Sequence, residues 1–367
     1  MIKLIEGRKL SHINLCLEKN VQARNVSTGF GDVFFVHRAL PEISIKEVDT
    51  RTEFFGHKVS APILIEPMTG GVRKAAKINA TLAEAAETVG VPLGIGSQRA
   101  AIEDPSLAYT YKVARERAPN TFLIANLGVA QLTSGYGVAE AQRAVDMIEA
   151  DALALHLNPL QEAVQPEGER EYSKALPRIK EITEALSVPV IIKETGAGIA
   201  AEEAKMIEDV GAKGIDVSGV GGTSWAAVEC YRAKKLKDRL HEKLGESFWD
   251  WGIPTAVGVV EAHLSTKLKV IASGGVRTGL DVAKAIALGS DIAGLALPLL
   301  KPALEATEKV VETLQTLIEE LKVAMFLTGS KSIEDLKSSS IVIIGKTAEW
   351  LRARGFDLES YSRRKRI

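Results

Sequence analysis

Residues Val188-Pro-Val-Ile-Ile-Lys-Glu-Thr-Gly196 carry the clearest indication of the fold. It is an apolar run typical of a buried strand, and it ends in Lys193 beside a short polar turn that contains a glycine. Similar runs recur about every thirty residues along the chain. A strand–helix unit repeated at this spacing is typical of the α/β barrel with eight parallel strands, the (β/α)8 or TIM barrel. The carboxyl ends of all its strands meet at one face, so we expect Lys193 in a functional site there.

Eight segments have this pattern, and each is rich in apolar residues, as expected of parallel strands buried on both faces. They are residues 63–68, 92–97, 122–126, 152–156, 188–193, 214–217, 269–273 and 292–295. Amphipathic segments that indicate helices lie between them at 77–89, 106–117, 139–149, 174–186, 200–210 and 280–288. The interval between the sixth and seventh strands is too long for one unit, so we expect an insertion at about 233–263. A lid, an oligomer contact and a simple elaboration remain open for it.

The remaining segments are predicted to be additions to a single domain whose barrel spans residues 61–330. Residues 1–60 form an N-terminal extension that contributes to the substrate site, with a helix at 8–19 and short strands at 33–35, 43–45 and 52–54. A long helix is expected at 304–326. Residues 331–367 form a C-terminal helical tail, with helices at 332–336 and 347–353. No low-complexity linker divides the sequence, so one elaborated domain is the simplest organisation.

Composition and charge exclude several classes of function. The sequence is 46% hydrophobic and 25% charged, which is typical of a globular protein. Its net charge of −1 gives no general attraction to nucleic acid or to a membrane, so neither is an expected partner. The sequence has no apolar run of about 18 residues and no signal peptide at its start. Two cysteines, Cys16 and Cys230, are too few for a disulfide framework and favour a cytoplasmic location.

Two glycine-rich loops follow the sixth and seventh strands, at residues 218–225 and 273–279. Glycines let backbone N–H groups approach phosphate oxygens, and the last loops of this fold commonly bind phosphate. Arg277 could add a charged donor. The alternative is a pair of tight turns that need glycine for a positive φ. Residues 219–222 break the spacing of the dinucleotide-binding fingerprint, so that motif does not explain them.

A second anion site is predicted from basic residues far apart in the sequence. Arg8 and His12 share one face of the expected N-terminal helix, and Lys9 flanks that face. With Arg99 and His156, which follow or end strands, these positive or hydrogen-bonding groups could hold a diphosphate. A solvated helix end is the alternative.

A metal site is predicted in the fourth loop. Glu162 lies six residues after the end of the fourth strand, close in sequence to the candidate diphosphate site. Mg²⁺ prefers one or two carboxylates together with phosphate oxygens and water. Glu162 is therefore a candidate Mg²⁺ ligand because of the neighbouring motif, whereas by itself it is more typical of a surface residue.

Seven motifs in order resemble those of the flavin-dependent type 2 isopentenyl-diphosphate isomerases. They are Arg8-Lys-Leu-Ser-His12, Ala61-Pro-Ile-Leu-Ile-Glu-Pro-Met-Thr-Gly-Gly71, Gly94-Ile-Gly-Ser-Gln-Arg99, His156-Leu-Asn-Pro-Leu-Gln-Glu162, Lys193-Glu-Thr-Gly196, Ser218-Gly-Val-Gly-Gly-Thr-Ser-Trp225 and Ser273-Gly-Gly-Val-Arg277. The resemblance implies FMN in the mouth of a TIM barrel. It implies a redox-neutral proton shift that interconverts isopentenyl and dimethylallyl diphosphate with reduced FMN and Mg²⁺, and NADPH as the reductant. It also implies a homo-oligomer, a tetramer or an octamer.

The resemblance further assigns roles to individual residues. Those implied to bind FMN are Met68, Thr69, Gly70, Ser97, Asn126, Lys193, Ser218, Thr223, Gly275, Val276, Arg277, Ala296 and Leu297. Those implied to bind the substrate or line its pocket are Arg8, Lys9, His12, Ser97, Gln98, Arg99, His156, Asn158 and Gln161. Glu162 is implied to hold Mg²⁺. The implied catalytic residues are Lys193, which stabilises negative charge on reduced flavin, and Gln161, which positions the substrate or relays a proton with Glu162.

Three other functions are weighed against this one. An FMN-dependent 2-hydroxy-acid oxidase needs a histidine base and an arginine clamp in the loop after the sixth strand, and residues 218–225 contain neither. A flavin-free lyase or synthase would use Lys193 as a Schiff-base nucleophile, and a yellow purified protein would exclude it. A non-catalytic scaffold is disfavoured, because polar residues follow the strand ends all around the barrel.

Overall fold

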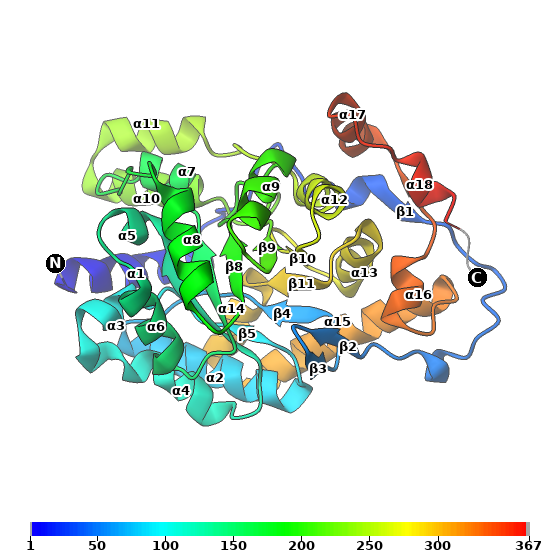
Figure 1. Ribbon diagram of the computed structural model, residues 1–367, viewed down its shortest axis with the longest axis horizontal. Coiled ribbons are helices and arrows are strands. Elements are labelled where there is room, and N and C mark those ends of the chain that lie inside the picture. Colours follow the sequence, from blue (N-terminus) through cyan, green and yellow to red (C-terminus); the bar gives the residue numbers. More distant parts are fainter. Residues whose placement is uncertain (1, 365–367) are drawn as a thin grey trace.

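The predicted barrel is confirmed by the computed structural model, which describes residues 2–364 (Figure 1). Its parallel strands close in the order β10-β11-β4-β5-β6-β7-β8-β9. Their bounds are β4 Ile63–Ile65, β5 Leu93–Gly94, β6 Leu123–Gly128, β7 Ala152–His156, β8 Val190–Lys193, β9 Gly214–Asp216, β10 Lys269–Ala272 and β11 Ile292–Leu295. His156 pairs with Lys193, and Lys193 pairs with Asp216. These three strand ends therefore lie in one layer at the carboxyl face of the barrel.

Side chains from alternate strand positions fill the barrel interior, because successive residues of a strand point to opposite faces. The interior cluster includes Leu64, Ile124, Ala152, Ala154, Ile191, Ile271 and Ile292. A hairpin of β2 (Thr52–Phe54) and β3 (His57–Val59) adds Phe54 to this cluster, with its ring 5.4 Å from that of Phe122. The amino-terminal end of the barrel is thus packed with apolar side chains, and ligands must enter from the carboxyl face.

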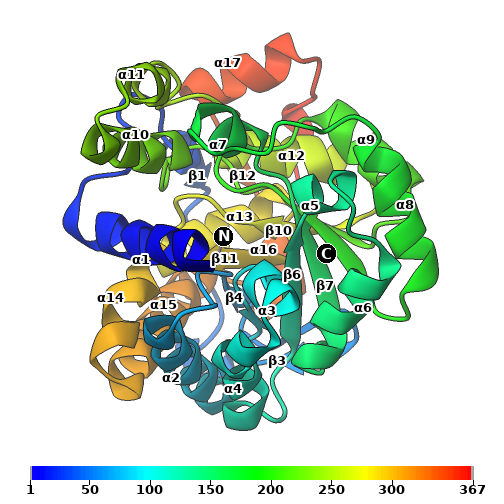
Figure 2. The ribbon, with the colours of Figure 1, turned by 90° about the vertical axis from the view of Figure 1, so that its left-hand side faces the viewer.

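Helices cover the outside of the strands (Figures 1 and 2). The ring consists of α2 Arg73–Val89, α4 Tyr109–Arg117, α6 Val138–Met147, α8 Ala175–Ala185, α9 Ala201–Asp209, α12 Thr255–Ser265, α13 Gly279–Leu288 and α15 Thr307–Leu327. Helix α2 buries Ala75, Ile78 and Leu82 and ends at Gly90, whose φ of 78° is the left-handed conformation common after helices. Helix α15 is the long helix expected after the barrel, and it contacts both α13 and α2. It therefore completes the ring.

Other helices lie at the carboxyl face. They are α1 Ile2–Glu18, α3 Arg99–Glu103, η3 Pro105–Leu107, α5 Val129–Thr133, α7 Pro159–Val164, α10 Trp225–Leu236, α11 Arg239–Ser247 and α14 Leu297–Glu305. Figure 2 shows α1 lying across this end of the barrel, where it contacts α10 and α14. The N-terminal helix thus covers the barrel mouth. Within residues 2–364, no helix has both the length and the apolar character needed to cross a lipid bilayer.

The insertion between the sixth and seventh strands begins and ends earlier than the predicted residues 233–263. Helices α10 and α11 are the inserted elements, whereas α12 packs against α9, α13 and β10 as a helix of the ring. Residues 255–262 of α12 are all buried, so this helix lacks the polar stripe by which the other ring helices are recognised in the sequence.

The N-terminal extension and the C-terminal tail are joined by a small sheet. After η1 (Phe30–Asp32), strand β1 (Val33–Phe35) pairs antiparallel with β12 (Ile341–Ile343). The tail also contains α16 Ile333–Lys337, α17 Gly345–Ala353 and α18 Glu359–Ser362. It is not purely helical as predicted, because β12 interrupts it. Residues 365–367 of the predicted tail lie outside the described residues.

One predicted strand of the extension is wrong. Residues 43–45 form no strand, and η2 (Ile45–Glu47) is a short 3-10 helix that begins there. Ser44 caps this helix, since its side chain accepts from Lys46 N while the Glu47 carboxylate accepts from Ser44 N. Local capping by a serine and a glutamate thus outweighs the β-branched composition of the segment.

Candidate active site

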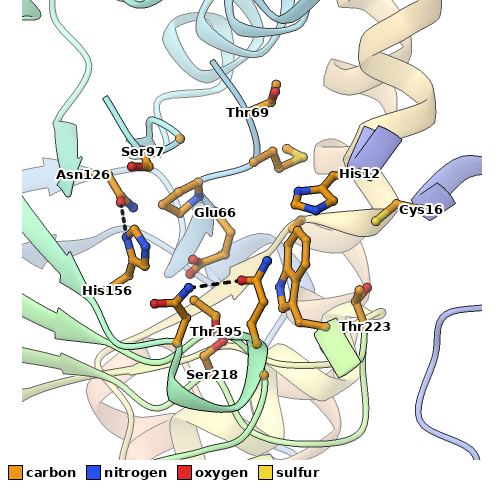
Figure 3. A pocket seen from close by; sticks show the side chains of 18 of the residues that line it. His12, Cys16, Glu66, Thr69, Ser97, Asn126, His156, Thr195, Ser218 and Thr223 are labelled. Atoms are coloured by element: carbon orange, nitrogen blue, oxygen red, sulfur yellow. Dashed lines mark hydrogen bonds between the residues drawn. The ribbon is translucent and has the colours of Figure 1, made fainter. Parts of the chain in front are cut away.

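A cavity of about 290 Å³ lies at the carboxyl face of the barrel, with residues of α1 in its wall (Figure 3). This volume is at the lower end of the range that small-molecule sites occupy. The predicted site residues that line it are Arg8, Lys9, His12, Met68, Thr69, Ser97, Arg99, Asn126, His156, Asn158, Gln161, Glu162, Lys193, Ser218, Thr223, Gly275, Arg277, Ala296 and Leu297. The structure thus brings both predicted anion sites to one cavity.

Three predicted site residues do not line this cavity. Gln98 is fully buried behind it, where its Nε2 donates to Ala144 O (2.7 Å) and its Oε1 accepts from Asn126 N (2.9 Å). Its predicted role in substrate binding is therefore wrong, and it joins a strand to the helix ring. Gly70 packs against Tyr111, and a Cβ atom there would lie 2.0 Å from the ring. Val276 is buried in the core.

Lys193 lies between two buried carboxylates. Its Nζ is 2.6 Å from Asp216 Oδ2 and 2.9 Å from Glu66 Oε2, and Ser273 Oγ donates to Asp216 Oδ1 (2.6 Å). Burial alone lowers the pKa of Lys193, but Asp216 and Glu66 outweigh it and raise that pKa above its ordinary value. The ammonium group is therefore charged, and its hydrogen bond to Asp216 Oδ2 fixes its position.

Neither carboxylate was predicted as a functional residue. Glu66 follows β4 directly and Asp216 is the last residue of β9. Both lie within segments that we interpreted only as apolar strands. An acidic residue inside such a run was the signal, because a buried carboxyl group needs a partner. Lys193 ends β8, which pairs with the strand of Asp216 and lies across the barrel from β4.

The two glycine-rich loops pack against each other. A Cβ atom at Gly222 would lie 2.4 Å from Gly275 N, and Gly274 and Gly275 have φ values of 100° and 77°. Within the described part of the chain, the backbone N–H groups of Gly275 and Val276 have no acceptor. Both interpretations of the glycine-rich sequence therefore apply to this loop. Its turn requires glycines with positive φ, and its free N–H groups are donors of the kind that bind a phosphate group.

The segment after α1 braces these loops. Gln22 forms a β-bridge with Thr223, and Ala23 N donates to Gly222 O (2.9 Å). Gln22 Oε1 also accepts from Arg277 Nη2 (2.8 Å). The extension thus supports the glycine loops as well as providing α1, although the sequence pointed only to the second role.

Lys9 is held at the wall of the cavity in an environment that disfavours its charge. Its Nζ donates to Ser97 O (3.0 Å) and to Tyr111 Oη (2.9 Å). Burial, and then the nearby Arg8 and Arg99, lower the pKa of Lys9 to about 7. A bound anion would favour the protonated form, so proton uptake and anion binding are linked here.

The other basic residues of this region have partners on several elements. Arg99 Nε is 2.7 Å from Glu103 Oε1, and its Nη1 is 2.6 Å from Glu169 Oε1. Arg8 Nη1 donates to the amide oxygen of Gln165 (3.2 Å) when that amide is oriented to satisfy both of its atoms. The arginines are therefore positioned by hydrogen bonds before any anion arrives.

His12 and Gln161 share a carboxylate that the sequence did not point to. His12 Nε2 (2.9 Å) and Gln161 Nε2 (3.2 Å) both contact Glu229 Oε1, and Arg232 pairs with the other oxygen. Burial opposes the charge of Glu229, but His12 and Arg232 outweigh it and hold its pKa below the usual range. Glu229 lies on the inserted helix α10, outside every predicted motif. Gln161 is also linked to Glu162 through Asn158, whose Nδ2 donates to Gln161 Oε1 (3.3 Å) and to Glu162 Oε1 (2.9 Å), and the predicted relay between Gln161 and Glu162 stays a prediction.

His156 contributes no positive charge of its own at neutral pH. Its Nδ1 is 2.8 Å from Asn126 Oδ1, as Figure 3 shows. Burial, and then Lys193 and Lys9, lower the pKa of His156 to about 4. Because Asn126 Oδ1 is an acceptor, Nδ1 carries the hydrogen and Nε2 is left with a lone pair. His156 can therefore contribute to the anion site through hydrogen bonds, and not through a positive charge.

Glu162 is a buried carboxylate at the start of α7. Its Oε1 accepts from Asn158 Nδ2 (2.9 Å) and its Oε2 accepts from Glu169 N (2.7 Å), while burial raises its pKa. Among residues 2–364, no group of three or more His, Cys, Asp or Glu side chains could hold a metal ion. A metal ion at Glu162 would therefore take most of its ligands from substrate and water.

Comparisons with known proteins agree with this geometry. The family model described as FMN-dependent dehydrogenase matches residues 3–126 and 164–343. A solved lactate oxidase of Pediococcus acidilactici has a TM-score of 0.65 with 19% sequence identity and 94% coverage of each chain. A mandelate oxidase with benzoyl-formic acid has a TM-score of 0.60 with 17% identity, covering 92% of this chain and 94% of that one. The fold and site thus define a barrel of the FMN-dependent dehydrogenase class.

Closer relatives narrow this class. The isopentenyl-diphosphate delta-isomerase of Methanosarcina acetivorans is 50% identical over 362 residues, 99% of this chain and 98% of the relative. That of Pyrococcus furiosus is 49% identical over 366 residues, 98% of this chain and 91% of the relative. The chain belongs to the isopentenyl-diphosphate delta-isomerases, in their FMN-dependent type 2 form, and it is an isomerase.

Proposed function

We propose that this protein interconverts isopentenyl diphosphate and dimethylallyl diphosphate by a redox-neutral proton shift, with reduced FMN and Mg²⁺ in the cavity. One observation carries the proposal: a single cavity joins the glycine loops to the basic residues of α1. One region suits the phosphate of a cofactor and the other suits the diphosphate of a substrate.

The residues at the barrel side of the cavity fit FMN. The free N–H groups of Gly275 and Val276, in loops too crowded for a Cβ atom, suit its phosphate. Met68, Thr69 and Asn126 would border the ring, and Lys193 would face its polar edge. Reduced FMN would supply an electron-rich ring and an acid–base position beside the substrate alkene. NADPH as the reductant stays a prediction.

The residues at the α1 side fit a diphosphate. Arg8, Lys9 and Arg99 supply positive charge, and Glu162 would hold Mg²⁺ together with diphosphate oxygens. In this arrangement Lys9 becomes fully protonated when the anion binds. Asn158 Nδ2 lies 2.9 Å from Glu162 Oε1 and orients that carboxylate.

The remaining residues position the hydrocarbon part and keep water away from it. Moving the double bond requires a proton to be gained at one carbon and lost at another, with positive charge developing between them. Gln161, oriented by Glu229, would position the substrate for this transfer. His12 stacks edge to face on Trp225, with ring centroids 5.1 Å apart, and the contact links α1 to α10 over the site. This contact supports a lid function for the insertion.

The decisive assay incubates the anaerobically reduced holoprotein with isopentenyl diphosphate and Mg²⁺ and looks for dimethylallyl diphosphate. Formation of that product is expected, and its absence with intact reduced flavin would refute the proposal. The oxidase alternative predicts instead that a 2-hydroxy acid bleaches the oxidised flavin. A homo-oligomer of four or eight chains and a cytoplasmic location stay predictions, and light scattering on the purified protein tests the first.

A further inference from the structure

Glu66 is a buried acid at the edge of the cavity for which the proposed function has no role. It is 4% exposed and lines the cavity. Its Oε2 lies 2.9 Å from Lys193 Nζ, but within the described chain neither carboxyl oxygen makes a hydrogen bond of acceptable geometry. Glu66 is therefore close to Lys193 without forming a hydrogen bond to it. A Cβ atom at Gly294 would lie 1.8 Å from Glu66 Oε1, so only the absence of a side chain there makes room for the acid.

Asp216 already serves as the counter-ion of Lys193. It accepts from Lys193 Nζ (2.6 Å), from Ser273 Oγ (2.6 Å) and from Ser218 N (3.3 Å). If Glu66 were also ionised, the cluster of Lys193, Asp216 and Glu66 would carry a net negative charge, and Glu66 would be a buried anion without a donor. Such an anion is strongly disfavoured.

The other titratable groups around the cluster do not change this balance. His156, on the neighbouring strand β7, is uncharged at neutral pH. Glu194, next to Lys193, accepts from the backbone N–H groups of residues 195–197, and burial raises its pKa to about 7, with Lys193 a weaker opposing influence. Burial, and then Asp216, raise the pKa of Glu66 to about 8.

We propose that Glu66 is a positioning residue that retains its proton during catalysis. Asp216 alone then neutralises the ammonium group of Lys193, and this group remains available to an anionic ring bound in the cavity. This inference rests on the proposed function only for the identity of that ring. As a neutral acid, Glu66 can also donate a hydrogen bond into the cavity. When it ionises at high pH, the cluster becomes negative and disfavours reduced, anionic FMN relative to oxidised FMN.

The first test uses the protein without cofactor and compares the wild type with Glu66→Gln, a neutral side chain of the same shape. A folded-state pKa raised above the unfolded value means that stability is lost as pH rises from about 4.5 to about 8. We expect the unfolding equilibrium constant of the wild type, relative to E66Q, to grow by up to about tenfold per pH unit in this window and to level off above it. A ratio that does not change with pH would overturn the proposal.

A second measurement uses infrared spectroscopy. The carbonyl band of a protonated carboxylic acid that is present in the wild type and missing from E66Q should be seen at pH 7 and should disappear as pH passes about 8. Asp216→Asn removes the other counter-ion, so Glu66 should then pair with Lys193 and lose its proton at lower pH. If the band of that variant disappeared at the same pH as in the wild type, the charges of the three side chains would not be coupled.

The third test measures how tightly the protein binds reduced and oxidised FMN across the same pH range. The ratio of the two affinities should fall above about pH 8 in the wild type by up to about tenfold per pH unit, relative to E66Q. An identical pH dependence of the two proteins would overturn the role of Glu66 toward Lys193. If the protein bound no FMN, the proposed function would fail, while the cofactor-free experiment would still decide the protonation of Glu66.

Discussion

Replacing Lys193 with methionine should destabilise the protein by an amount that grows with pH. The substitution removes the cation between Asp216 and Glu66, which are 1% and 4% exposed. Removing one partner of a buried ion pair costs about 3–5 kcal/mol, because the other charge is left buried and unpaired. An unpaired buried charge is costly only in its ionised form, so the loss should be small in acid and should grow as pH rises.

Urea unfolding of the cofactor-free protein, followed by circular dichroism at pH 5 and pH 8, measures this effect. Lys269→Met is a matched control, since Lys269 also lies on a barrel strand and pairs with Asp291 (3.1 Å), but its side chain is 48% exposed. A half-exposed pair contributes about 0–1 kcal/mol, so the control should change little at either pH. A Lys193→Met protein that is as stable as the control at pH 8, or that loses equal stability at both values, would refute the buried charge balance. The variant should also lack isomerase activity.

Three further predictions test the cavity and the barrel. The KM for the diphosphate should rise by up to about tenfold per pH unit as pH passes about 7, because Lys9 then loses its proton. Lys9→Arg should flatten this pH profile, and a variant with the same profile as the wild type would show that Lys9 does not bind the diphosphate. Glu162→Gln should weaken the response to Mg²⁺ while FMN stays bound, and an identical metal titration would reject Glu162 as a ligand. Phe54→Ala should lower the free energy of unfolding by about 3–5 kcal/mol. Phe34→Ala is the control, because this side chain is 49% exposed and its loss should change the free energy of unfolding by about 0.5 kcal/mol or less. Equal losses in the two variants would contradict the apolar packing at the amino-terminal end of the barrel.

The barrel could be predicted because its signals are local. Each strand is a short apolar run that ends at a polar residue or glycine, as at Lys193, and most ring helices carry an amphipathic stripe. What could not be predicted depends on distant partners. Strand β12 exists because β1 pairs with it, and helix α12 has no polar face because α9, α13 and β10 surround it. Segment 43–45 was assigned to a strand on composition, with no partner to support it.

The candidate site divides in the same way. Residues in recognisable loops, such as Thr223 and Gly275, line the cavity as expected. Gln98 does not, because a side chain next to a strand end can point either into the mouth or back toward the helix ring, and the sequence does not say which. Glu66 and Glu229 were missed because their significance comes from the basic and amide groups that folding brings to them.

The pairing of β1 with β12 has a consequence for biosynthesis. Roughly three hundred residues separate the two strands, so a ribosome that adds about 5–20 residues per second needs about 15–60 s to bring the second after the first. Asp32, just before β1, also accepts from Thr347 N (2.9 Å) in the helix after β12. The last barrel strand ends at Leu295, and Gln22 and Ala23 contact loop residues made well before β12. The barrel strands and this first attachment of the extension can therefore form during synthesis, whereas the second attachment, through β1, forms only when the chain is almost complete.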